Sequence, residues 1–200
     1  MTGEIPDHRT QPGGREQAPG DLAVVQAFVN SHYDIDAEGG GELLAGPADL
    51  RHWLVAHSLI DPQARLTRRD CDRAVAVREG MRALAYANNG EEADPDAIEA
   101  MRGASAGART EIRVSPDGPR FVPDADGGID AAIGSLLAIA ARAMLDGSWE
   151  RLKACPGRDC GWAFYDRSRN QSGHWCSMKI CGDREKARVY YRRRTRGEDR

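Results

Sequence analysis

Four cysteines near the C-terminus are the residues of this chain best placed to do chemistry. They form two pairs, Cys155 with Cys160 and Cys176 with Cys181; four residues separate the members of each pair and fifteen separate the pairs. Two short loops that each offer two thiolates are typical of a closed tetrahedral zinc site. We therefore predict one structural Zn²⁺ ion held by these four cysteines.

Two other interpretations of the cysteines fit the sequence less well than zinc. Disulfides need an oxidising compartment, and the first residues, 1–8, contain no apolar stretch typical of an export signal. Four unrelated buried thiols would not be expected to fall into two equally spaced pairs. The fifth cysteine, Cys71, lies in a predicted helix far from the others, and we expect it to be a small core residue.

The net charge of −3 hides an uneven distribution of charge along the 200 residues. Residues 151–200 carry 14 Lys and Arg against 6 Asp and Glu, whereas residues 1–150 carry 14 against 25. This split predicts a basic module for an anionic partner, joined to an acidic body.

The basic residues after Cys181 follow a helical spacing. Arg side chains recur every fourth position, which places them in one stripe along a helix, and further basic residues add positive charge to the helix beyond this stripe. Such a stripe suits the phosphates of a DNA groove or an RNA backbone, although a merely solvated basic terminus is the bland alternative. The candidate nucleic-acid contacts here are Arg184, Lys186, Arg188, Arg192, Arg193 and Arg196.

The remaining features of the C-terminal region suggest a small treble-clef-like module. We expect Gly182 to turn the backbone, Asp183 to cap the basic helix, and Ala187 with Tyr190 or Tyr191 to face the zinc core. Four aromatic residues in the module could stack on unpaired bases or, as we expect, pack around the zinc. These are Trp162, Phe164, Tyr165 and Trp175.

The rest of the chain reads as an α+β body that is mostly helical. Apolar periodicity predicts helices near 47–57, 67–89, 94–101 and 129–147, and a β-hairpin of 110–114 with 120–122. Thr67 with Asp70 and Asp94 with Pro95 are the expected helix starts, and Asn88-Asn89-Gly90 and Gly147 are the expected helix ends. The segment 21–30 is either a strand or a helix. We expect a disordered tail over 1–20, a regulatory domain over 21–150 and the zinc module over 151–200.

No catalytic constellation is evident in the body, so we expect no enzyme activity. There is no phosphate-binding Gly loop and no His pair with metal-ligand spacing. His52 and His57 are more simply explained as packed or solvated rings than as ligand contacts. No run approaches the roughly 18 apolar residues that span a bilayer, which predicts a cytoplasmic protein with no membrane partner.

Several motifs of the C-terminal region resemble the CGNR zinc finger. They are Asp166-Arg-Ser-Arg-Asn170, Trp175-Cys-Ser-Met178 and Cys181-Gly-Asp-Arg-Glu-Lys-Ala-Arg188. In the body, Phe28-Val-Asn-Ser31, Leu43-Leu44 and Leu50-x-x-Trp53-Leu54 are similar to the opening of the ABATE domain of bacterial stress-induced transcription regulators. The resemblance implies four Cys zinc ligands, a DNA-binding C-terminus with Arg169 as a further contact, and an N-terminal domain that senses a signal. Asp183 replaces the signature Asn of the finger, so we assign it no DNA contact.

The resulting expectation is a transcription regulator that binds double-stranded DNA through its structural-zinc module. A small-molecule effector and a homodimer on paired half-sites accompany this hypothesis. The alternative is a zinc-stabilised RNA- or protein-binding adaptor without DNA sequence specificity. A third class, a small-molecule-binding protein or enzyme housed in the body, would respond to a metabolite independently of residues 151–200.

Overall fold

The computed structural model describes residues 15–33, 41–116, 118–123 and 127–196, and it has the expected α+β architecture. In chain order, the helices and strands are α1 (Leu22–Val29), β1 (His32–Tyr33), β2 (Gly41–Glu42), α2 (Pro47–Ala56), α3 (Arg68–Ala87), α4 (Pro95–Ala104), β3 (Thr110–Ser115), β4 (Gly118–Pro123), α5 (Ile129–Asp146), β5 (Leu152–Ala154), β6 (Ala163–Tyr165) and α6 (Asp183–Arg196). The strands form three separate antiparallel pairs, β1–β2, β3–β4 and β5–β6.

Local signals set the ends of the main helices as the sequence predicted. Thr67 and Asp70 make a reciprocal capping box at the start of α3, with Asp in the place usually held by Glu. Asp94 accepts hydrogen bonds from the first backbone amides of α4. Gly147 ends α5 with a φ of 79°, a left-handed conformation that suits glycine. The segment 21–30, whose sequence is compatible with either a strand or a helix, contains helix α1.

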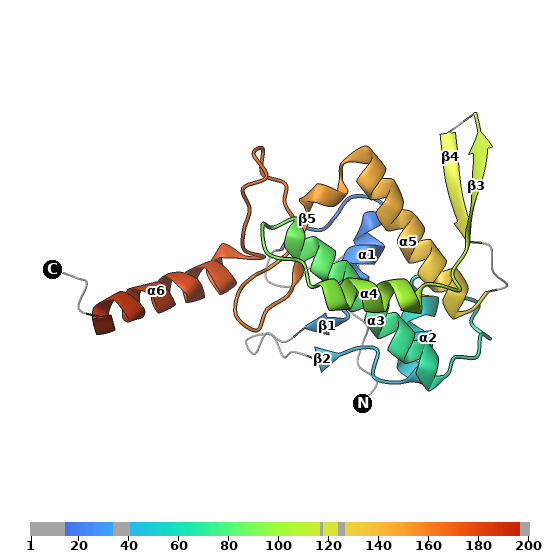
Figure 1. The fold of residues 1–200 in the computed structure, drawn as a ribbon, viewed down its shortest axis with the longest axis horizontal. Helices are drawn as coiled ribbons and strands as arrows, with labels where there is room; N and C mark the ends of the chain where they lie inside the picture. Colours follow the sequence, from blue (N-terminus) through green and yellow to red (C-terminus); the bar gives the residue numbers. More distant parts are fainter. Residues whose placement is uncertain (1–14, 34–40, 117, 124–126, 197–200) are drawn as a thin grey trace.

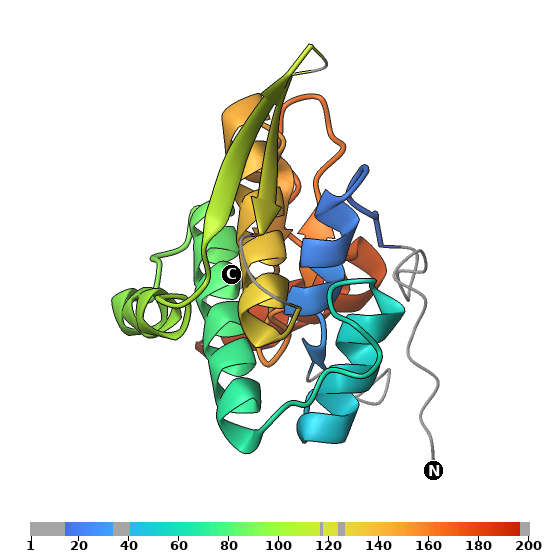
Figure 2. The same cartoon turned by 90° about the vertical axis from the view of Figure 1, so that its right-hand side faces the viewer.

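Helix α3 runs through the middle of the molecule, and the other helices of the body pack around it. Helices α1 and α5 contact α3 and each other, while α4 lies along its other side (Figures 1 and 2). Val25, Phe28, Leu50, Val77 and Leu136 are almost fully buried where these helices meet. This arrangement leaves α6 and the β3–β4 hairpin as the two elements that project from the body.

The short sheet β5–β6 belongs to the same core as the helices. Leu152 and Ala163 are completely buried, and together with Tyr165 they pack in the cluster formed by α1, α3 and α5. The zinc module predicted over 151–200 therefore begins inside the body's core. Among the described residues, no helix combines the length and apolar character needed to cross a membrane.

The N-terminal tail expected over 1–20 is ordered from Arg15 onward; residues 1–14 lie outside the described residues. Arg15 and Ala18 are buried, and the backbone amide of Tyr165 in β6 donates a hydrogen bond to the Glu16 carbonyl. The expectation of disorder was thus wrong for 15–20. Composition could not reveal this, because the segment gains its order from contacts with a sheet 150 residues away in the sequence.

Candidate metal centre and nucleic-acid interface

The first cysteine pair lies in the connection between β5 and β6. Hydrogen bonds from Cys155 N to Trp162 O (3.0 Å) and from Cys160 N to Gly157 O (3.0 Å) fold this connection into a tight knuckle. A Cβ at Gly157 would lie 3.1 Å from the sulfur of Cys181, so a larger residue there would push against the second pair.

The second cysteine pair lies at the entrance to α6. The backbone amides of Cys181 and Gly182 both donate to the carbonyl of Ser177, in a π-helical turn that spans Met178–Gly182 and continues directly into α6. Helix α6 is consequently anchored to the rest of the chain through this cysteine loop.

The four thiols meet at one buried point. Their sulfur atoms all lie within 4.8 Å of one another, with 3.7 Å between Cys160 and Cys176 and 3.6 Å between Cys176 and Cys181. A regular tetrahedron with Zn–S bonds of about 2.3 Å has edges of about 3.8 Å, so the observed spacing fits a zinc ion closely. Four thiolates leave no open position, and the zinc is therefore structural.

A cation and aromatic rings surround the thiol cluster. The buried rings of Trp162 and Phe164 pack against the cysteines, and the guanidinium of Arg15 lies 4.5 Å from the centre of the Trp162 ring. Hydrogen bonds from the neighbouring thiols, with a smaller contribution from Arg15, lower the pKa of Cys176. A nearby cation favours thiolate and offsets the negative charge that four thiolates bring to a zinc ion.

Side chains of the body hold the backbone of both cysteine loops. Asn30 exchanges two hydrogen bonds with Ala163, of 2.9 and 2.7 Å. Arg82 donates to the Gly161 carbonyl next to Cys160, and Asn89 donates to the carbonyls of Ala154 and His174, which flank the first and second loops. The metal centre is therefore positioned by α1 and α3 as well as by its own segment.

Sequence reasoning missed Arg15, Asn30, Arg82 and Asn89. The sequence indicates only that Asn89 lies near a helix end, and α3 does end at Ala87. In the structure the Asn89 side chain is also buried against the zinc module. The sequence shows only that some of these polar or charged side chains lie beside an apolar helical face. It does not show that they contact the cysteine loops.

A buried ion pair shapes the loop between β6 and the second cysteine pair. Lys153 and Asp166 are each about 4% exposed, and 2.8 Å separates the Lys153 nitrogen from Oδ2 of Asp166. Lys153 also donates to the carbonyls of Gln171 and Gly173. The loop that carries Arg169 is thus closed around one lysine.

Replacing Asp166 with Asn should destabilise the protein by about 2 kcal/mol at pH 7. Burial alone would raise the pKa of Asp166, but hydrogen bonds from Lys153, Ser168 and Gly173 lower it from 3.8 to about 2. A lowered pKa means that this stabilisation is complete above pH 3.8 and is lost as pH falls toward 2. Urea unfolding at pH 7 measures the difference, because zinc itself is released in acid.

The exposed pair Glu99–Arg102 provides the control for this experiment, since its side chains are 67% and 74% exposed. Glu99→Gln should change the free energy of unfolding by less than about 0.5 kcal/mol. An Asp166→Asn variant as stable as Glu99→Gln would show that the buried pair does not hold the loop.

Helix α6 is exposed along its length. No residue from Asp183 to Thr195 is buried, and the helix extends away from the body (Figure 1). Ala187, Tyr190 and Tyr191 are exposed, so the expectation that they face the zinc core was wrong. The helix projects past the cysteine cluster rather than folding back over it.

Asp183 and Gly182 also differ from expectation. The helical turn already begins at Met178, and Ser177 occupies the capping position, so Asp183 lies inside a continuous helix. Its carboxylate is 3.4 Å from Lys186. Gly182 lies inside the π-helical turn rather than at a bend, and a Cβ there would meet only the flexible end of the Met178 side chain, at 2.8 Å.

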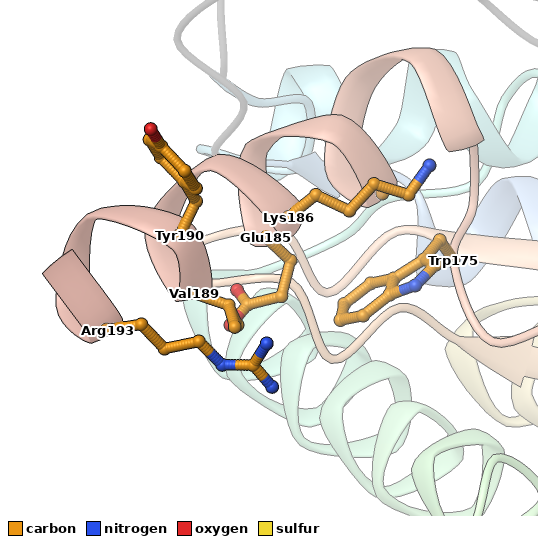
Figure 3. A pocket seen from close by; sticks show the side chains of 7 residues that line it. Trp175, Glu185, Lys186, Val189, Tyr190 and Arg193 are labelled. Atoms are coloured by element: carbon orange, nitrogen blue, oxygen red, sulfur yellow. The ribbon is translucent and has the colours of Figure 1, made fainter. Parts of the chain in front are cut away.

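A groove of about 350 Å³ runs along one side of α6, where the helix passes the second cysteine loop. Figure 3 shows Val189 and Glu185 between Arg193 and the ring of Trp175. The remaining lining residues are Gly182, Lys186 and Tyr190. The groove combines two cations with two aromatic rings, which are groups that contact phosphates and bases in nucleic-acid complexes.

The predicted nucleic-acid contacts fall into three places. Lys186 and Arg193 line the groove, whereas Arg184, Arg188 and Arg192 are exposed on α6 outside its lining, with Arg188 bound to Glu185 at 3.0 Å. Arg169 is exposed on the separate loop after β6. Arg196 ends α6, and its side chain lies outside the described residues. The structure thus places six of the seven predicted contacts on one projecting helix.

The two histidines and the fifth cysteine have ordinary structural surroundings. His57 stacks on Trp53 with 3.8 Å between ring centres, and its Nδ1 lies 2.8 Å from the Trp53 carbonyl. His52 is exposed on α2. Cys71 is 1% exposed in the helical core, and burial raises the pKa of its thiol.

Comparison with known proteins agrees with the sequence motifs and the geometry. Residues 151–194 match the family model described as the CGNR zinc finger, and residues 20–147 match the ABATE model, described as "putative stress-induced transcription regulator". No curated protein matches the chain. Because the ABATE model covers more than half of the 200 residues, the chain belongs to the ABATE family, with a CGNR zinc finger at its C-terminus.

Proposed function

We propose that the protein is a DNA-binding transcription regulator that uses α6 and the loop carrying Arg169 to contact the duplex. The observation that carries this proposal is the exposure of α6 combined with its charge. Between Asp183 and Arg196 the helix has seven Lys and Arg against two acidic residues, a net charge of +5. Like charges in one stripe repel each other, and phosphates alongside would remove that cost.

The zinc centre would supply the rigidity that such a helix needs. A 14-residue helix with no buried face is marginal in water. In this chain it continues from the cysteine loop, so zinc would hold its first turn in place and orient it relative to the body. We infer that Arg184, Arg188 and Arg192 neutralise phosphates and that Lys186 and Arg193 contact DNA from the groove side.

The alternative of a single-strand-binding adaptor has one supporting observation. Trp162, Phe164 and Tyr165 are buried, whereas Trp175 and Tyr190 line the groove with rings able to stack on bases. Two rings and two cations would accommodate a short unpaired segment, but the stripe of α6 outside the groove favours a longer, regular array of phosphates.

The test is selection of bound duplexes from a random DNA pool by the zinc-loaded full chain, with a chelated sample as control. A zinc-dependent enriched motif is the expected result, and a palindromic motif would agree with a homodimer on paired half-sites. Tighter binding to single strands than to any duplex would refute the duplex proposal and favour the adaptor.

We place the effector-sensing role at the junction between α3 and the first cysteine loop. Two neighbouring hollows there, of about 470 and 240 Å³, share Glu79, Arg82 and Tyr86. Arg82 links them to the metal centre, because it binds Glu79 at 2.8 Å and also donates to Gly161 beside Cys160. A metabolite-library thermal-shift screen should find ligands whose stabilisation is lost in Tyr86→Ala; ligands that stabilise both forms equally would place the site elsewhere.

A further inference from the structure

The β3–β4 hairpin carries apolar side chains that the other residues described by the structure leave exposed. Ile112 is 62% exposed and Val114 is 84% exposed, while Phe121, opposite Ile112 on β4, is half-buried. The base of the hairpin packs on α5, but its distal part rises free of the helices (Figures 1 and 2). A two-stranded ribbon also has two open edges, each a template for further strand pairing.

The two edges are not equivalent, because prolines block one of them. In the hairpin, Pro119 pairs with Val114 and Pro123 pairs with Thr110. Proline has no amide hydrogen, so these are the non-hydrogen-bonded pairs, whose backbone groups point outward. The β4 edge therefore lacks two of its donors. By the same alternation Thr110, Ile112 and Val114 present their amides and carbonyls on the open edge of β3.

We propose that β3 pairs through this open edge with β3 of a second copy of the chain, antiparallel and centred on Ile112. The charges on the strand select this register. Centring on Ile112 places Glu111 opposite Arg113 of the second copy, twice over. Centring on Glu111 or on Arg113 instead would place like charges directly opposite each other, which destabilises a strand pair.

The pairing makes use of both the edge and the exposed side chains. Three residue pairs would be hydrogen-bonded, each exchanging two bonds, for about six bonds in all. Thr110, Ile112 and Val114 lie on one face of the strand, so the apolar side chains of both copies would meet around the twofold axis. Glu111 and Arg113, which bind each other at 2.9 Å within one strand, would form the same contact between strands on the other face.

This interface rests on the homodimer that accompanies the proposed function, but it forms without DNA and without α6. Sedimentation of the zinc-loaded full chain in the absence of DNA therefore tests it separately. DNA binding by a protein that stays monomeric would refute this interface alone, and a dimer that binds no DNA would refute only the DNA proposal.

The experiment uses two charge reversals, Glu111→Arg and Arg113→Glu. In a dimer of either variant alone, positions 111 and 113 of the two copies carry like charges and lie opposite each other. We therefore expect the dissociation constant of that dimer to be about a hundredfold higher than that of the unaltered chain. Mixed in equal amounts, the two variants place opposite charges at both positions, so a heterodimer should form. Sedimentation velocity of the two samples and their mixture measures this.

Arg102→Glu is the matched control, since it reverses one charge in an exposed ion pair on α4 and should leave the dimer unchanged. Ile112→Pro tests the backbone, because it removes one outward amide without touching the β3–β4 ladder, and it should abolish dimerisation while zinc content stays at one per chain. A monomeric unaltered chain at tens of micromolar, single variants that dimerise normally, or a mixture that fails to recombine would each overturn the proposal.

Discussion

Removing the zinc should destabilise the whole chain and not only its C-terminal module. The zinc-free protein should unfold at a much lower temperature than the zinc-loaded protein. A structural zinc contributes on the order of 10 kcal/mol of apparent folding free energy, comparable to the total stability of a domain of this size. Cys176→Ser or chelation should therefore lower the melting temperature by more than about 15 °C, as calorimetry would measure.

Loss of zinc should destabilise the body as well because the body and the zinc module share one core. Leu152 and Ala163 on either side of the first cysteine loop are fully buried among the body's helices, and Asn89 holds both cysteine loops to the end of α3. When the cysteine cluster opens, buried hydrogen bonds of Asn30 and Arg82 lose their partners as well. Unsatisfied buried groups of this kind cost about 1–3 kcal/mol each.

Cys71→Ala is the matched control, since Cys71 is equally buried but lies away from the cluster. It should lose about 1 kcal/mol or less and keep one zinc per chain. The contrary result would be a zinc-free protein in which residues 21–150 unfold at the same temperature as before and only the small transition of the zinc module disappears. Residues 21–150 would then be an independent domain despite the shared core.

Most of the local structure could be predicted from the sequence because its causes are local. The Thr67–Asp70 box, the Asp94–Pro95 start and Gly147 each act within one helical turn, and the structure confirms all three. The spacing of the four cysteines similarly predicted the metal cluster, because each short loop fixes its own pair.

The features that sequence could not predict depend on distant partners. Arg15 lies in a Gly- and Pro-rich segment, yet it is buried 4.5 Å from Trp162. The face of α6 was predicted wrongly because Ala187 and Tyr190 resemble a buried stripe, whereas the direction in which the cysteine loop releases the helix decides what it touches. The periodicity of residue types shows which face of a helix is apolar, but it does not show whether another part of the chain packs against that face.

Replacing Arg184, Arg188 and Arg192 together with Ala should weaken DNA binding on every sequence and flatten its salt dependence. Each lost phosphate contact reduces the slope of log K against log salt by about 0.9, so the triple variant should lose about 2.7 from the slope. The three residues are exposed, and alanine favours helix, so α6 and the zinc centre should stay intact. Titration of a fluorescent duplex between 50 and 200 mM salt measures the slope.

The control removes the same charge from the body, through Arg65→Ala, Arg69→Ala and Arg102→Ala, three exposed positions on or near α3 and α4. If net charge alone drove binding, the two triple variants would lose equal amounts of slope, and the assignment of α6 as the contacting helix would fail. If the stripe contacts phosphates, only the α6 variant loses the full amount. Counterion release depends on which phosphates are neutralised, so the body variant should keep a slope close to that of the unaltered chain.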